Sequence, residues 1–144
     1  MTEEQKEIRK WLSRAFYVNN KIKALEAVRE RNRALATKCT ASYESDGSTS
    51  GSQDNSKEKI IHEICDNDLA IRKELDSLVK IRTEISKKIS GLENDELETI
   101  LSMRYLGYMS MQQIADQMHY DRRTIQRKYI IALDKIKDVI ECHI

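Results

Sequence analysis

The sequence predicts an all-α fold, in which a long antiparallel, coiled-coil-like helical hairpin is followed by three shorter helices. The 144 residues contain no proline and four glycines, and the absence of the strongest helix breaker permits very long helices. Apolar residues recur at helical spacing along two long stretches. Further on, helix-capping residues precede short apolar runs.

The two long stretches predict the hairpin. Residues 3–36 predict one helix with a broad apolar stripe, and residues 57–92 predict a second. The second helix has ten coiled-coil seam positions, and eight of them, all but Asp68 and Arg82, are apolar. The ten are Ile61, Ile64, Asp68, Ile71, Leu75, Leu78, Arg82, Ile85, Ile89 and Leu92. Neither helix can bury its stripe alone, so an antiparallel pair is predicted. A parallel coil between two chains satisfies the same heptads.

Between these helices, residues 37–56 are rich in Ser, Thr, Gly and Asp and carry few core-forming side chains. This composition predicts a flexible connector. The charged seam residues Asp68 and Arg82 either set the register of the pair or reach solvent where the coil widens. The predicted domains are therefore residues 1–92, a hairpin with its Ser/Gly-rich insert at 37–56, and residues 93–144.

Residues 95–137 predict three shorter helices from their caps. Asp95 caps the first, which Gly107 ends, and Ser110 caps the second, MQQIADQM. A corner at residues 119–120 follows, and Asp121 caps the third helix. Two helices joined by such a corner form a helix-turn-helix, whose second helix lies in the major groove of DNA.

The third helix has two distinct faces. An apolar face is formed by Ile125, Tyr129, Ala132, Leu133 and Ile136. The start of the helix leaves side chains suited to phosphates and base edges pointing outward: Arg122, Arg123, Thr124, Gln126 and Arg127. Lys128 is expected to lay its aliphatic stem on the core and direct its ammonium toward a phosphate. These six residues are the predicted DNA-binding site.

The charge distribution agrees with this site. The whole chain is nearly balanced, with 25 Lys and Arg against 24 Asp and Glu. From residue 122 to 137, however, six basic residues face one acid, and residues 1–36 hold nine basic residues against five acids. A local basic stripe is the electrostatic feature expected of a nucleic-acid-binding protein.

One segment resembles the C-terminal helix-turn-helix of bacterial sigma factors, called region four: SMQQIADQMHYDRRTIQRKYIIALDKI. The resemblance runs through Ser110, Ile114, Ala115, Met118, Asp121, Ile125, Ala132 and Leu133. It implies that Arg122, Arg123, Thr124, Gln126 and Arg127 enter the major groove of promoter DNA. His119 stands where that motif usually has glycine with a positive φ, a conformation that His tolerates better than most residues.

The organisation of the whole chain resembles that of small phage and prophage proteins of Gram-positive bacteria. In both, a long helix, a Ser/Gly-rich insert and a second long helix precede a segment that here reads RYLGYMSMQQIA. These phage and prophage proteins are related to ArpU/RinA-type late-gene transcription regulators. The resemblance implies a sequence-specific DNA-binding regulator with double-stranded DNA as partner. Because a single small module binds DNA weakly, either a homodimer or a binder assisted by RNA polymerase is expected. Two alternatives stay open: a DNA-packaging subunit like a small terminase, or a coiled-coil protein that binds RNA polymerase or a host factor.

Other function classes find little support in the sequence. No nucleotide-binding glycine motif or catalytic constellation is recognisable, so neither an enzyme nor a cofactor is expected. His62 and Cys65 share one helical face, but two ligands do not make a structural zinc site. Three scattered cysteines, no apolar run of membrane-spanning length and no secretory signal predict a soluble cytoplasmic protein. The resemblance to phage and prophage proteins implies a bacterial host and association with the nucleoid.

Overall fold

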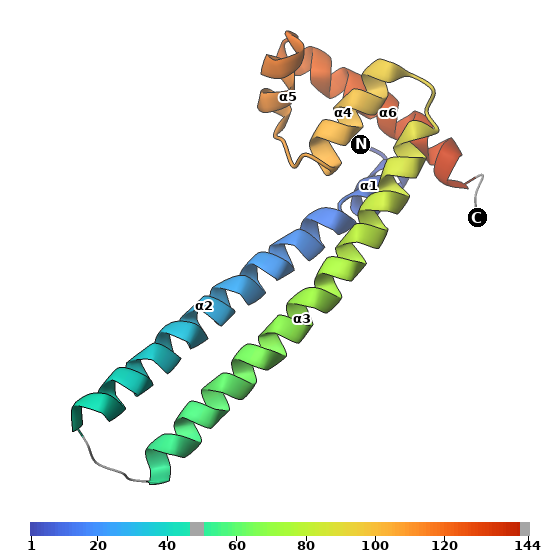
Figure 1. The fold of residues 1–144 in the computed structure, drawn as a ribbon. Coiled ribbons are helices and arrows are strands. Elements are labelled where there is room, and N and C mark those ends of the chain that lie inside the picture. Colours follow the sequence, from blue (N-terminus) through green and yellow to red (C-terminus); the bar gives the residue numbers. More distant parts are fainter. Residues whose placement is uncertain (47–50, 142–144) are drawn as a thin grey trace. The chain divides into compact units, whose positions relative to one another are not determined.

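A computed structural model describes the backbone of residues 1–46 and 51–141, and the side chains of residues 1–38 and 56–141. Within these residues the chain is all-helical and contains no β-strand, which confirms the predicted fold class. The helices are α1 (Glu3–Leu12), α2 (Arg14–Asp46), α3 (Gly51–Ser90), α4 (Asp95–Tyr105), α5 (Met111–Met118) and α6 (Arg122–Glu141) (Figure 1). In the described part of the chain, no helix is both long and apolar enough to cross a membrane.

The single helix predicted over residues 3–36 is wrong, because the chain breaks at Ser13 into α1 and α2. At the break, the Ser13 hydroxyl donates a hydrogen bond of 2.7 Å to the carbonyl of Arg9. The break allows α1 to pack against α6. There the Gln5 side chain donates a hydrogen bond of 2.7 Å to the Asp134 carboxylate. No local sequence pattern predicts this contact.

The two long helices extend further than predicted. α2 continues to Asp46 and α3 begins at Gly51, so most of the predicted connector at 37–56 is helical in backbone. This segment contains no proline, so nothing in it stops a helix sharply. Its Ser, Thr and Asp residues have only modest helix propensity, but they are compatible with a helix. Of this connector, residues 47–50 lie outside the described residues.

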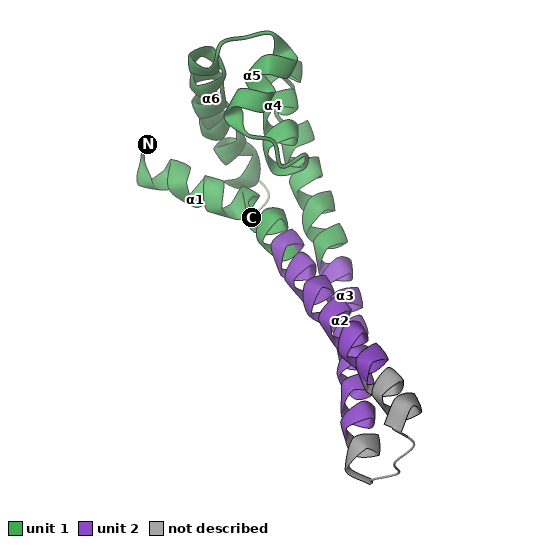
Figure 2. Cartoon of the chain, turned by 90° about the vertical axis from the view of Figure 1, so that its left-hand side faces the viewer, with its two compact units in different colours: residues 1–18, 78–144 green, residues 19–77 purple. Residues whose placement is uncertain are grey.

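The chain forms two compact units, coloured in Figure 2. Unit 1 comprises residues 1–18 and 78–144, and unit 2 comprises residues 19–77. Both long helices contribute to each unit. The domain boundary predicted at residue 92 lies inside unit 1, because the last turns of α3 share a core with α4, α5 and α6.

Unit 1 has one continuous apolar core. Its buried members are Leu12, Ala15, Ile85, Ile89, Leu97, Ile100, Leu101, Tyr105, Ile114, Ala115, Ile125, Tyr129, Ala132, Leu133, Ile136 and Ile140. Each large apolar side chain contributes about 1.5–3 kcal/mol when fully buried. The end of α3 approaches α6 so closely that a Cβ atom on Gly91 would lie 2.8 Å from Cγ1 of Val139. Glycine at this position therefore permits the packing.

The start of α4 differs in one detail from the prediction. Asn94, rather than Asp95, is the N-cap, and its side-chain oxygen accepts a hydrogen bond of 3.1 Å from the Leu97 amide. Asp95 lies one position later, in the acidic first turn, where its charge favours the positive end of the helix. The helix ends near Gly107 as predicted, and the Gly107 amide donates to the carbonyl of Ser102 at 2.9 Å.

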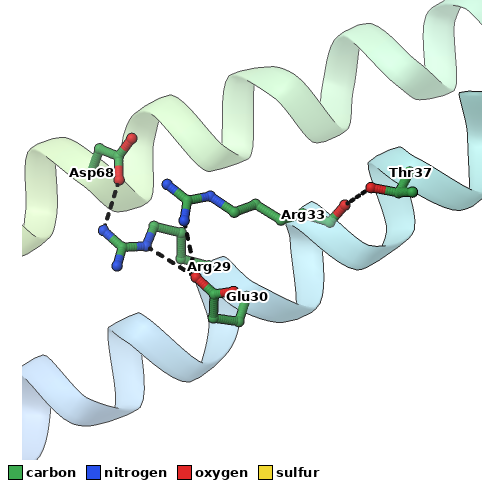
Figure 3. A network of polar contacts seen from close by, with 5 residues as sticks. All are labelled: Arg29, Glu30, Arg33, Thr37 and Asp68. Carbon is green, nitrogen blue, oxygen red and sulfur yellow. Dashed lines mark hydrogen bonds and ion pairs between the residues drawn. The ribbon is translucent and has the colours of Figure 1, made fainter.

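Unit 2 consists of paired parts of α2 and α3. Arg29 contacts Asp68 at 3.1 Å and Lys21 contacts Glu74 at 2.9 Å, so residue numbers increase along one helix as they decrease along the other. Figure 3 shows the Arg29–Asp68 contact together with Glu30, which also contacts Arg33. Asp68 therefore pairs with Arg29 across the two helices.

The predicted coiled-coil seam is only partly buried. Ile71 in unit 2 is 5% exposed, whereas the seam positions Ile61 and Leu75 are 45% and 43% exposed. Arg82, a seam position in unit 1, donates hydrogen bonds to the Leu106 carbonyl and to the Tyr108 hydroxyl. Arg82 therefore holds the segment after α4 against α3.

Candidate nucleic-acid interface

The start of α5 is held by a reciprocal cap. The Ser110 hydroxyl accepts a hydrogen bond of 3.2 Å from the Gln113 amide, and the Gln113 side chain accepts one of 2.8 Å from the Ser110 amide. This capping box satisfies two backbone donors that the helix itself leaves free. One turn later, Ile114 and Ala115 are completely buried. The predicted Ser110 cap is confirmed, and α5 is anchored on the core.

The corner between α5 and α6 depends on His119. This residue has φ 61° and ψ 38°, the left-handed conformation that few residues other than glycine adopt. The amides of both His119 and Tyr120 donate to the carbonyl of Ala115. These bonds end α5 and turn the chain toward α6. The left-handed corner expected at His119 is confirmed.

Asp121 stands immediately before α6, as predicted. Its carboxylate accepts a hydrogen bond from the Thr124 hydroxyl. That hydroxyl is the largest cause that lowers the pKa of Asp121, followed by backbone amides and the charge of Arg123. Thr124 is half-buried and its hydroxyl already serves the helix start. The hydrogen bond to Asp121 therefore competes with the predicted role of the Thr124 hydroxyl as a base contact.

The two faces of α6 differ sharply. Its inner face is buried along the whole helix and comprises Ile125, Tyr129, Ala132, Leu133, Ile136 and Ile140. On the outer face of the first two turns, four side chains are exposed: Arg122, Arg123, Gln126 and Arg127. None of the three arginines forms an ion pair with any residue that the structure describes. A helix anchored by its buried inner face thus presents three exposed arginines that form no ion pair with described residues, with Asp121 as the adjacent acid.

Lys128 does not take the position expected for it. Its ammonium forms an ion pair with Glu96 of α4 and lies 5.2 Å from the centroid of the Tyr120 ring. The Lys128 contact is the largest cause that lowers the pKa of Glu96, and the same contact raises the pKa of Lys128. Its ammonium is therefore bound to α4 rather than presented for a phosphate. Tyr120 also donates to Glu96 at 3.2 Å.

Sequence reasoning missed Glu96 and Tyr120 as neighbours of the basic helix. The acidic run around Glu96 was a signal, but it predicts only charges at a helix start. Among the described residues, no group of three or more His, Cys, Asp or Glu side chains is placed to hold a metal ion. His62 and Cys65 are both exposed on α3.

These features define an all-α protein whose last helix presents an exposed basic start on a buried support. A family model described as "Protein of unknown function (DUF1492)" matches residues 38–137. The match covers more than half of the chain, so the chain belongs to the DUF1492 family. No curated protein and no solved structure matches it.

Proposed function

We propose that this protein is a sequence-specific DNA-binding transcription regulator of phage or prophage type. In this proposal α5, the His119 corner and α6 act as a helix-turn-helix similar to sigma-factor region four. One observation carries the proposal: Arg122, Arg123, Gln126 and Arg127 lie exposed together, without ion pairs to described residues, on a helix whose other face is buried.

The chemistry of these side chains suits a major groove. An arginine fork can donate two hydrogen bonds to guanine, and a glutamine amide can pair with adenine. To read bases, the recognition helix must keep a fixed orientation relative to the rest of its domain when its side chains enter the groove. Burial of Ile125, Tyr129 and Leu133 supplies that rigidity. Each arginine that meets a phosphate should also displace condensed cations, which makes the affinity depend on salt.

α2 and α3 are proposed to form the antiparallel hairpin that the sequence predicts. A single small module binds DNA weakly, and specific affinity usually needs a second half-site. In unit 2, the apolar side chains of Val28, Leu35, Ile61, Leu69 and Leu75 are 36–63% exposed. We propose that these helices supply the additional contact, either with a second copy or with RNA polymerase.

The direct test is selection of bound sequences from a random duplex pool, followed by gel-shift titration. Arg123→Ala and Gln126→Ala should each lower the preference for the selected duplex over random duplex by about 1–3 kcal/mol. Arg72→Ala is the matched control, because Arg72 is an exposed arginine in unit 2. Equal losses on both duplexes would remove the base-reading assignment, and no binding at low salt would end the proposal.

The two alternative functions differ from a regulator in assembly and in DNA binding. A packaging subunit would assemble into a large ring, whereas a regulator should be a dimer. Light scattering of the purified chain separates these outcomes. A protein that acts only through the paired helices would retain partner binding and ignore every duplex.

A further inference from the structure

A cavity of about 360 Å³ opens in unit 1 between α1, the first turn of α2 and the end of α4. Among its lining residues are Arg9, Lys10, Phe16, Arg104, Tyr105 and Tyr108. None of the six residues predicted to bind DNA lines it. The cavity is therefore a separate feature of the same unit.

The lining of this cavity is cationic, and one of its cations is paired with a neighbouring carboxylate. Of the residues that the structure describes, four cationic side chains line it and no carboxylate does. Lys6 is paired with Glu3, whereas Arg9 and Lys10 form no ion pair with any described residue. Arg104 donates to the backbone carbonyl of Met109 at 2.9 Å, which leaves its charge unbalanced. Such a group of donors is suited to a phosphate or another compact anion.

Aromatic rings form another part of the wall. The rings of Phe16 and Tyr108 have centroids 5.9 Å apart and an interplanar angle of 57°. Arg82 holds Tyr108 in place through a hydrogen bond of 3.0 Å to its hydroxyl. Phe16 is 43% exposed, so part of its ring surface is open to a ligand in the cavity. A planar ring could stack on this exposed surface.

Size restricts the ligand. Small-molecule pockets usually measure about 300–1,000 Å³, and this cavity of about 360 Å³ lies near the lower limit. A cavity of this volume accommodates a compact anion together with one planar ring.

We propose that this cavity binds a mononucleotide-like ligand, with its phosphate at Arg9, Lys10 and Arg104 and its base against Phe16 and Tyr108. The occupied site would also touch Tyr105, whose hydroxyl contacts that of Tyr129 on α6. A bound nucleotide would thus lie next to the contact that joins α4 to α6. The site stands on its own geometry and does not require that α6 bind DNA.

Isothermal titration of the full chain with AMP and with GMP at low salt tests the proposal. At least one nucleotide should bind saturably, and inorganic phosphate and adenosine should each bind about tenfold more weakly, because each supplies only half of the contacts. The double variant Arg9→Gln/Lys10→Gln should weaken nucleotide binding about tenfold or more. Both side chains are exposed, so circular dichroism should show an intact fold.

A matched charge control is the double variant Arg72→Gln/Lys73→Gln, which removes two exposed cations from unit 2 and should bind nucleotide as the parent does. Phe16→Ala should weaken AMP or GMP but leave phosphate unchanged. The proposal fails if neither nucleotide binds at millimolar concentration, or if the Arg9/Lys10 variant binds as well as the parent. Displacement of the bound nucleotide by a short single strand or duplex would assign these cations to a nucleic-acid backbone and also overturn it.

Discussion

Tyr105 of α4 and Tyr129 of α6 offer a sharp test of how the two helices are joined. Each tyrosine is 4% exposed, and their hydroxyl groups form a hydrogen bond with each other. Replacing either tyrosine with phenylalanine removes one hydroxyl and keeps the ring. The remaining hydroxyl is then buried without its partner. Replacing both removes the polar pair altogether.

The structure sets the expected magnitudes. A buried hydroxyl that loses its partner costs about 1–3 kcal/mol, so Tyr105→Phe and Tyr129→Phe should each lower the free energy of unfolding by that amount. The double variant should lose clearly less than the sum, because no hydroxyl is left unpaired. In a chain of 144 residues, about 1 kcal/mol corresponds to roughly 3–5 °C in Tm.

The assay is urea and thermal unfolding followed by circular dichroism on the parent, both single variants and the double variant. Tyr17→Phe is the matched control, since Tyr17 is 64% exposed and should change stability by less than about 0.5 kcal/mol. Additive losses in the double variant would refute the reasoning, because they would mean that the two hydroxyls do not depend on each other.

The same pair predicts a loss of stability at high pH. Burial is the main cause that raises the pKa of Tyr105, and the neighbouring Tyr129 raises it further. The folded state therefore retains a proton that the unfolded chain releases above about pH 10. The contribution of the Tyr105 hydroxyl to the free energy of unfolding is fully present below that pH. It declines as the pH rises toward the folded-state pKa. Tyr105→Phe should flatten the decline in urea titrations above pH 10. An unchanged pH profile would argue against the burial of this hydroxyl.

Three further substitutions test other parts of unit 1. Glu96→Gln should free Lys128 from its ion pair, raise affinity for random duplex and steepen the salt dependence by at most about 0.9 in slope; an unchanged slope would contradict this. His119→Gly should stabilise the left-handed corner by at most about 1 kcal/mol in urea unfolding, whereas His119→Val should destabilise it; the reverse order would exclude a strained corner. Gly107→Ala should cost about 1–3 kcal/mol, because its Cβ would lie 2.9 Å from the Met103 carbonyl oxygen; an unchanged Tm would show that the backbone relaxes freely.

Local features of the fold were predictable from the sequence because their causes lie within a few residues. Ser110 meets Gln113 in the same turn, and Asp121 meets Thr124 in the next helix start. His119 occupies a position where only the conformation of one residue matters. Capping and corner rules apply directly to such cases. The inner face of α6 also followed from helical periodicity alone.

Features that depend on distant partners were not predictable in the same way. The break at Ser13 is clear only when α1 is seen against α6. The position of Lys128 is decided by Glu96, on another helix. The cavity of unit 1 is lined by residues from α1, α2 and α4, and no linear motif joins them. Periodicity shows which face of a helix is apolar, but it does not show which element covers that face.

The packing of α1 on α6 has a consequence for biosynthesis. A ribosome adds about 5–20 residues per second, so α1 leaves the exit tunnel roughly 10 s before α6 is complete. Leu12 is wholly buried in the folded chain. Throughout that interval its side chain lacks the complete core of unit 1 and is open to contact with other apolar surfaces. Unit 1 can therefore close only as a late event in synthesis, and chaperones that shield emerging helices have a defined period in which to act.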